Sequence, residues 1–348
     1  MKNIILTIDY ELYLGSKTGD VRSCMIEPTQ QLSALLANNG SKMTVFWDIL
    51  HYYKLLEHQT KFNELKEVAL MIEEQILSLA SEGHDIQLHL HPHWLDAVYK
   101  NNKWNFNYTR FKLQNLSEED DVNNINTISG CITIAKKLLE NVVKKVKPDY
   151  KVTTFRAGGY LIQPFSKLRK ALLKHEILID TSICSGLLKN NGIFSYNFLD
   201  YPSFVSYKFS RDPKKVEDTG AFTEVPIKTV NVPIHLNLYF TLLRHIKYRY
   251  LRKEVKGSGS GTTTNIKQPL YEKLYNLFFN YKMYQFTTDG NFKEIFEYMV
   301  KEVEEHSTMI LHSKSLNQHT IRTLNVLTKS NTVKFNSIND YLDNPTYK

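Results

Sequence analysis

Residues 83–93 read GHDIQLHLHPH, and this stretch contains a helix stop, a strand and a group of imidazoles. Gly83 follows a run over residues 62–80 in which apolar side chains recur at helical spacing. Residues 85–90 alternate polar and apolar side chains, which is typical of a strand, and Pro92 ends it. The stretch therefore predicts a helix that leads into a buried strand with a histidine-rich carboxyl end.

The same alternation of strand and helix patterns continues on both sides of this stretch. It predicts an α/β fold in which helices cover a parallel sheet. We expect one domain over residues 1–348, with insertions near 94–120 and 190–265 and a helix over the basic segment 236–256. Further strands are expected at residues 3–9, 42–47, 152–156, 177–180, 308–312 and near 332–335.

Polar side chains stand at the carboxyl ends of five of these strands. In α/β barrels the reactive groups lie at this end of the strands and come from several of them. We therefore expect these residues to form one site, and their placement favours a barrel over an open sheet. They are Asp9 and Glu11, then His89, His91 and His93, then Arg156, Asp180 and His312.

The histidines and the first two acids together predict a metal site. His89, His91 and His93 are two residues apart, so in an extended chain they share one face. Two imidazoles and one carboxylate make a site that leaves a position open for water. Asp9 or Glu11 could supply that carboxylate. Because like charges held close together cannot both ionise cheaply, we expect one acid to bind the metal and the other to take a proton.

The runs TIDYE, GHDIQLHLHPH, FRAGGY, DTSI and ILH resemble, in this order, the motifs of the polysaccharide deacetylases, the nodulation-type carbohydrate esterases. The resemblance spans residues 3–315 and implies a distorted barrel of about seven parallel strands. It also implies a metal-dependent hydrolase that removes acetyl groups from N-acetylated, sometimes O-acetylated, sugars or glycoconjugates. The metal would be zinc, with Fe²⁺, Ni²⁺ or Co²⁺ as alternatives. With Glu11 as its acid, the first motif resembles an Asp-x-acid branch found in surface-polysaccharide biosynthesis loci.

The resemblance also implies a role for individual residues. Gly158 stands where the family has a proline, Tyr10 stands where its commonest pattern has an aspartate, and His91 is a histidine that it does not require. The implied catalytic residues are Asp9 as general base, Arg156 beside it, His312 as general acid and Asp180 as the acid that tunes His312. The implied ligands and substrate contacts are Glu11, His89 and His93 for the metal, and Gly159 and Tyr160 for the substrate.

A loop rich in aromatic residues follows the histidines. We expect Trp94 in this loop to stack against a sugar ring, with packing of the loop against the barrel as the alternative. The three cysteines are far apart, which excludes a disulfide framework and a thiolate zinc site.

The chain carries 44 basic and 36 acidic residues, a net charge of +8. Residues 244–256 hold six of the basic residues and one acid, so the excess is local and does not indicate a nucleic-acid binder. A helix over residues 236–256 could instead contact an anionic membrane surface. No apolar run reaches the roughly 18 residues of a membrane span, and the first residues lack the pattern of a signal peptide, so we expect a cytoplasmic protein. The sequence does not predict the oligomeric state.

Two other functions remain open at this point. Two histidines and one carboxylate also form the iron site of non-haem oxygenases, although such an enzyme would leave Asp9, Arg156 and His312 without a role. The second is a carbohydrate-binding protein that has the same barrel and has lost catalysis through Tyr10 or Gly158.

Overall fold

The computed structural model describes residues 1–348 except 16, 247–256, 258, 261–281, 331 and 345–348. Its centre is a nine-stranded sheet, in which every pairing is parallel except the one between its last two strands at one edge. The strands are β1 (Lys2–Tyr10), β2 (Thr44–Asp48), β3 (Asp85–Leu90), β6 (Thr154–Ala157), β7 (Ile179–Asp180), β10 (Tyr207–Phe209), β11 (Phe222–Glu224), β14 (His306–His312) and β15 (Val333–Asn336).

The strand order is β10-β11-β7-β6-β3-β2-β1-β14, and β15 pairs with β1 as well. Just beyond β11, Ile227 forms a parallel bridge with Thr308 of β14, so the chain links the two ends of this order. The sheet is therefore curled, and the prediction of an α/β fold with a parallel sheet is confirmed. Of the nine strands in the described sheet, all but β10 take part in parallel pairings, so the predicted count of about seven parallel strands is not confirmed.

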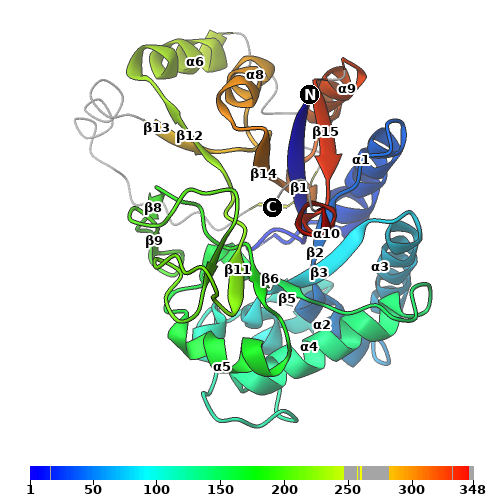
Figure 1. The fold of residues 1–348 in the computed structure, drawn as a ribbon. Coiled ribbons are helices and arrows are strands. Elements are labelled where there is room, and N and C mark those ends of the chain that lie inside the picture. The colour runs from blue at the N-terminus through cyan, green and yellow to red at the C-terminus, as the bar shows by residue number, and fades with distance from the viewer. Residues whose placement is uncertain (16, 247–256, 258, 261–281, 331, 345–348) are drawn as a thin grey trace.

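Helices surround the curled sheet (Figure 1). In α3 (Asn63–Ser81) the buried residues Leu65, Ile72 and Leu79 recur at helical spacing, which gives one apolar face as the sequence predicted. The helix α2 (Ile49–His58) was not predicted, because it follows β2 directly with no turn residue between them. Further helices in the described residues are α1 (Glu27–Ala37), α4 (Ile128–Val143), α5 (Ser166–Lys174), α8 (Lys293–Glu302), α9 (Gln318–Lys329) and α10 (Ile338–Asp343), besides α6, which is described below.

The first segment expected as an insertion contains short elements outside the main sheet, whereas the second contributes β10 and β11 to that sheet as well as elements outside it. Residues 94–120 include most of the 3-10 helix η2 (Pro92–Asp96) and a hairpin of β4 (Val98–Lys100) and β5 (Lys103–Asn105). Residues 190–265 include β12 (Thr229–Val232), which pairs with β13 (Lys282–Gln285), and α6 (Ile234–Ile246).

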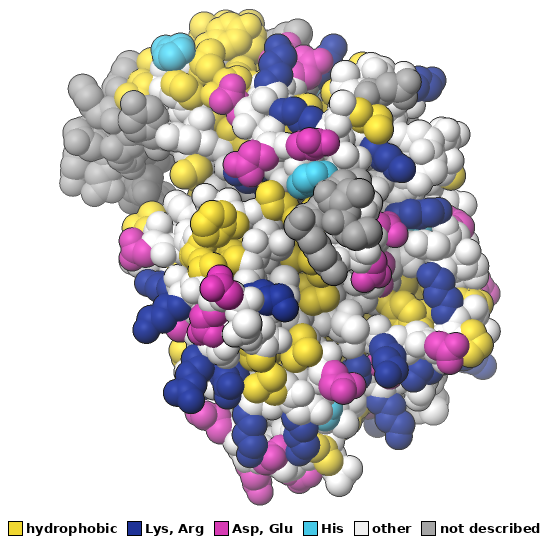
Figure 2. Space-filling model, in the orientation of Figure 1, with side chains coloured by type: hydrophobic (Ala, Val, Ile, Leu, Met, Phe, Trp, Pro, Cys, Tyr) yellow, Lys and Arg dark blue, Asp and Glu magenta, His cyan; other side chains and the backbone are white. Residues whose placement is uncertain are grey.

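The predicted helix over 236–256 is confirmed as far as Ile246, and the rest of it lies outside the described residues. Tyr239, Leu242 and Ile246 of α6 are exposed, and hydrophobic side chains gather over this helix at the top of the molecule (Figure 2). Among the described helices, none combines the length and the apolar character that crossing a membrane requires.

The register of the sheet determines which residues meet at its carboxyl edge. Asp9 of β1 lies opposite His312 of β14, and His89 of β3 lies between Asp48 of β2 and Arg156 of β6. Every residue of β1 from Ile4 to Tyr10 is buried. Chain segments far apart in the sequence therefore place polar side chains together at one buried edge.

Candidate metal centre

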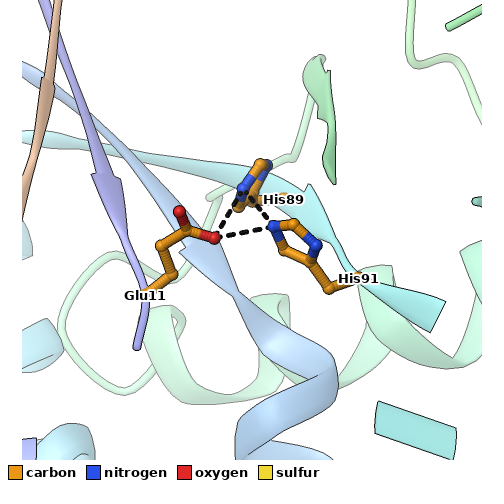
Figure 3. A group of neighbouring side chains, drawn as sticks. All are labelled: Glu11, His89 and His91. Atoms are coloured by element: carbon orange, nitrogen blue, oxygen red, sulfur yellow. Dashed lines mark hydrogen bonds and ion pairs between the residues drawn. The ribbon is translucent and has the colours of Figure 1, made fainter. Parts of the chain in front are cut away.

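Glu11, His89 and His91 converge on one point at the carboxyl edge of the sheet (Figure 3). The Glu11 Oε2 atom lies 2.6 Å from His91 Nε2 and 3.4 Å from His89 Nε2. The two Nε2 atoms are 3.1 Å apart. All three side chains are buried, and one potential ligand atom of each lies within 4.8 Å of the other two.

The tautomer of His89 suits a metal ligand. Its Nδ1 lies 2.9 Å from the carbonyl oxygen of Arg156. Because a carbonyl only accepts hydrogen bonds, Nδ1 carries the proton, and the lone pair of neutral His89 lies on Nε2, toward the cluster. The register of β3 with β6 fixes this contact, since His89 lies directly opposite Arg156.

A divalent metal fits this donor set. Ligand distances of 2.0–2.1 Å in a tetrahedral zinc site separate neighbouring ligand atoms by about 3.3 Å. The separations of His89 Nε2 from Glu11 Oε2 and from His91 Nε2 are close to that value, and the one between His91 Nε2 and Glu11 Oε2 is shorter, at 2.6 Å. Glu11 Oε2 is buried and receives no well-directed hydrogen bond from any residue that the structure describes. Two bare imidazole nitrogens at 3.1 Å repel each other unless a cation or a proton lies between them. A cation at this point would satisfy all three atoms.

The electrostatic field at the centre favours positive charge. Burial by itself lowers the pKa of His89, but Asp9 and Glu11 outweigh it and raise this pKa to about 9. Burial raises the pKa of Glu11, but Lys314 and His91 outweigh it and hold this pKa well below its usual value. Lys314 Nζ lies 2.6 Å from Glu11 Oε1, the oxygen that faces away from His91. Glu11 therefore stays ionised, with Oε1 paired to Lys314 and Oε2 facing the imidazoles of His89 and His91.

Asp9 is held by Arg156, which is the contact that the motif resemblance implied between these two residues. Arg156 Nη1 donates to Asp9 Oδ1 at 2.5 Å, and both side chains are buried. Arg156 also donates to Thr7 Oγ1 and to the backbone oxygen of Thr181, and its guanidinium lies over the ring of Phe46. Burial raises the pKa of Asp9, but the guanidinium outweighs it and leaves this pKa lowered. Asp9 is thus a carboxylate at neutral pH.

His312 lies beside Asp9 but is oriented by a residue that the sequence did not reveal. Its Nε2 is 3.6 Å from Asp9 Oδ2 and 3.9 Å from Glu11 Oε1. Its Nδ1 and its backbone nitrogen both donate to Asp289 Oδ2, at 2.7 and 2.9 Å. Burial lowers the pKa of His312, but the hydrogen bond to Asp289 outweighs it and leaves this pKa raised. Asp289 follows β13, a strand that was not predicted; only the Asp-Gly pair at 289–290 marked a turn there.

The predicted contact between Asp180 and His312 is wrong. Asp180 ends β7 and lies opposite Glu224 of β11, where it accepts a hydrogen bond from Ser182 Oγ at 2.7 Å. Burial raises the pKa of Asp180, and burial together with Asp180 raises the pKa of Glu224 well above its usual value. The two acids are therefore a buried carboxyl–carboxylate pair, and Asp289 takes the place beside His312.

His93, predicted as a ligand, lies outside the converging group. The chain turns into η2 at Pro92, so the two-residue alternation ends at His91 and the His93 ring enters the aromatic loop. It stacks against Phe111 at 5.5 Å, and neither ring nitrogen has a hydrogen-bond partner within the described part of the chain. Burial lowers the pKa of His93 well below its usual value. In the ligand set that the structure assembles, His91 replaces His93.

Of the residues predicted to contact the substrate, Trp94 is buried in the loop, whereas Tyr160 faces the site. Trp94 is 1% exposed and its Nε1 donates to Asp48 Oδ2 at 2.7 Å, so it packs the loop rather than offering a face to a sugar. Gly159 and Tyr160 have φ angles of 61° and 66°. The Tyr160 hydroxyl lies 3.4 Å from His312 Nε2, so it faces the same volume as Asp9. The strained backbone at Tyr160 directs its side chain into the site.

No protein-family model matches this chain, and no curated protein matches it. Among solved structures, it is similar to a protein of Mycobacterium smegmatis described as a candidate polysaccharide deacetylase, with 12% identity over 98% of this chain and 90% of that one, at a TM-score of 0.45. A 4-alpha-glucanotransferase of Thermococcus litoralis has a TM-score of 0.46 at 12% identity, over 99% of this chain and 40% of that one. A family 4 acetyl xylan esterase of Clostridium thermocellum, in complex with a cobalt ion, has a TM-score of 0.37 at 11% identity, over 97% of this chain and 89% of that one. At these scores the likeness carries no argument about activity.

Proposed function

We propose that this protein is a metal-dependent hydrolase that removes an acetyl group from an N-acetylated sugar or glycoconjugate. The observation that carries the proposal is the convergence of two sets of groups. Glu11, His89 and His91 offer three lone-pair atoms to one point, while Asp9 and His312 border the same volume from neighbouring strands. A ligand triad beside an ionised base and an acidic imidazole is the set of groups that amide hydrolysis needs.

The chain's own residues supply the proton transfers. A divalent metal held by Glu11, His89 and His91 would polarise the acetyl carbonyl and lower the pKa of a water molecule. Asp9 accepts a proton from the attacking water, and Arg156 keeps it ionised for that task. His312 Nε2 gives a proton to the departing nitrogen, because its Nδ1 is fixed on Asp289 and its Nε2 faces Asp9. The Tyr160 hydroxyl borders this volume and can contact the substrate.

We further propose zinc as the metal, a surface-polysaccharide precursor as the substrate and one barrel domain over residues 1–348. The motif series supports the first two, since the resemblance in residues 3–315 is to enzymes of this kind. A cytoplasmic location and a membrane contact through 236–256 stay predictions. The exposed side chains of Tyr239, Leu242 and Ile246 on α6 support that contact.

The proposal is tested by acetate release from a panel of N-acetylated mono- and oligosaccharides, with wild type and Asp9→Asn compared at equal metal content. Asp9→Asn should keep the metal and lose turnover by a factor of about 10² to 10⁴, because it removes the base and none of the ligands. Equal turnover in the two proteins would contradict the role of Asp9.

The two alternatives predict different results in the same assay. A carbohydrate-binding protein without catalysis would release no acetate and would bind glycans equally well before and after Asp9→Asn. An iron oxygenase would bind iron and consume oxygen. The ion pair of Asp9 with Arg156 and the contact of His312 with Asp289 favour the hydrolase, since an oxygenase triad uses neither.

A further inference from the structure

At the corner between β2 and α2, two residues contact the indole of Trp94, one at its N–H group and one on the face of its ring. Asp48 is the last residue of β2, and its Oδ2 accepts a hydrogen bond from Trp94 Nε1 at 2.7 Å. His51, in the first turn of α2, stacks on the indole with ring centroids 4.5 Å apart and an interplanar angle of 26°. All three side chains are 1% exposed. The proton transfers proposed for the site do not use these two contacts, and no sequence motif indicated them.

Trp94 belongs to the turn that carries His91. Its backbone nitrogen donates to the backbone oxygen of His91 at 3.0 Å, which closes the first turn of η2. The pairing of β3 with β6 ends at Leu90, opposite Ala157. His91 is therefore the first residue beyond the sheet, and the strand ladder that fixes His89 does not fix it.

The His91 ring is not held through its second nitrogen. His89 is oriented by the hydrogen bond from its Nδ1 to the Arg156 oxygen, whereas His91 Nδ1 has no hydrogen-bond partner among the described residues. The position of His91 Nε2 opposite Glu11 therefore depends on where the turn after β3 lies. The contacts of Trp94 with the β2–α2 corner determine that position.

We propose that Asp48 is a positioning residue of the candidate metal centre, and that its carboxylate acts through the Trp94 indole to hold the turn that places His91 Nε2 opposite Glu11. This inference rests on the proposed metal site. Partners that orient a metal ligand typically change metal affinity by a factor of about 10 to 100 when they are lost. The contact should therefore be measurable as metal affinity, without any turnover assay.

The test compares zinc dissociation constants of full-length variants, measured by competition with a chelating indicator. Trp94→Phe keeps a ring in place and removes the donor, so zinc affinity should fall by about 10- to 100-fold. Asp48→Asn keeps an oxygen that can accept the indole hydrogen bond, so its affinity should stay near that of wild type. The matched control is Tyr150→Phe, which removes an aromatic donor from a second buried acid, Asp85, at the opposite end of β3.

Tyr150→Phe should leave zinc affinity unchanged. Equal affinities of Trp94→Phe, Tyr150→Phe and wild type would overturn the inference and leave the proposed function intact. A wild-type protein that binds no zinc, cobalt, nickel or iron would overturn the proposed metal site, and the inference with it. Should Trp94→Phe not fold, Asp48→Ala removes the acceptor and keeps the indole, so its zinc affinity should fall in place of that of Trp94→Phe, and an unchanged affinity would overturn the inference. The visible spectrum of bound Co²⁺ gives a second readout, because a displaced His91 changes the ligand field and a purely structural role does not.

Discussion

Gly158 leaves the space in which His91 lies. A Cβ atom at residue 158 would be 2.5 Å from His91 Nδ1 and 2.5 Å from the backbone oxygen of Leu90. Neither neighbour can move freely, since one is a backbone atom and the other belongs to a buried ring. Gly158, where the motif resemblance implies a proline, and His91, which that resemblance does not require, are thus two parts of one local arrangement.

We predict that Gly158→Ala lowers zinc affinity, because the new methyl group displaces the His91 ring. Overpacking of this kind should also cost about 1–3 kcal/mol of the free energy of unfolding. Gly40→Ala is the control, since Gly40 has a φ of +66° but nothing within 4 Å of its Cβ position. It should cost about 1 kcal/mol through backbone strain and leave zinc binding unchanged. A Gly158→Ala protein with wild-type zinc affinity would contradict this reading of the site.

Asp289 and Asp180 can be distinguished by their effect on His312. Asp289 accepts from Nδ1 of His312 and raises its pKa, whereas Asp180 is paired with Glu224. Asp289→Asn should therefore lower the pKa of His312, and Asp180→Asn should change it much less. The titration of the His312 ring by NMR measures both effects. The larger effect in Asp180→Asn would restore the role that the motif series implied.

For single residues, the sequence predicts which side chains belong to the site more reliably than it predicts the contacts that they make. His89, Glu11, Asp9 and Arg156 could be predicted, because all four lie at or just beyond the carboxyl ends of parallel strands, which share one edge of the sheet. The choice between His91 and His93 could not, because it depends on the turn at Pro92. A two-residue alternation places both on one face only while the chain stays extended.

The short strands β7 and β11 pair two acids inside the fold. Glu224 is 0% exposed and lies opposite Asp180, which is 2% exposed. Because the pKa of Glu224 is raised well above its ordinary value of 4.5, the folded protein keeps a proton there that the unfolded chain releases above that value. The folded state then binds more protons than the unfolded state, so stability falls as pH rises from 4.5 toward the raised pKa.

Glu224→Gln should remove this dependence, because the amide does not titrate. The free energy of unfolding of wild type should fall relative to that of the variant by up to about 1.4 kcal/mol per pH unit in that window. Urea unfolding at about pH 5 and about pH 8 measures the difference. Parallel pH profiles for the two proteins would show that the pair does not retain its extra proton.

Elements with strong periodicity could be predicted closely, and elements without it could not. The strand at residues 85–90 and the helix α3 agree with the sequence pattern, since both bury a regular apolar set. The helix α2 and the strand β13 were missed. The first begins directly at the end of a strand, and the second is a short piece of an irregular segment, so neither carries a boundary signal.

At the scale of the whole molecule, the curled sheet explains why one site can use residues from 9 to 312. Parallel strands place all their carboxyl ends at one edge, and the bridge between Ile227 and Thr308 links the two ends of that edge. The alternation of strands and helices predicted this edge without any contact being known. The parts played by Asp289 and Asp48 could not be predicted, because Asp289 reaches the edge from a loop and Asp48 contacts Trp94 instead of a group of the site.

The central claim is that Glu11, His89 and His91 hold a metal ion and that His93 does not. The most direct measurement is metal content by mass spectrometry on purified wild type, His91→Ala and His93→Ala, each shown to be folded by circular dichroism. The structure predicts near-stoichiometric metal in wild type and in His93→Ala, and its loss in His91→Ala. Metal that is retained in His91→Ala and lost in His93→Ala would contradict the ligand set, and a wild type that binds no metal would contradict the proposed chemistry as a whole.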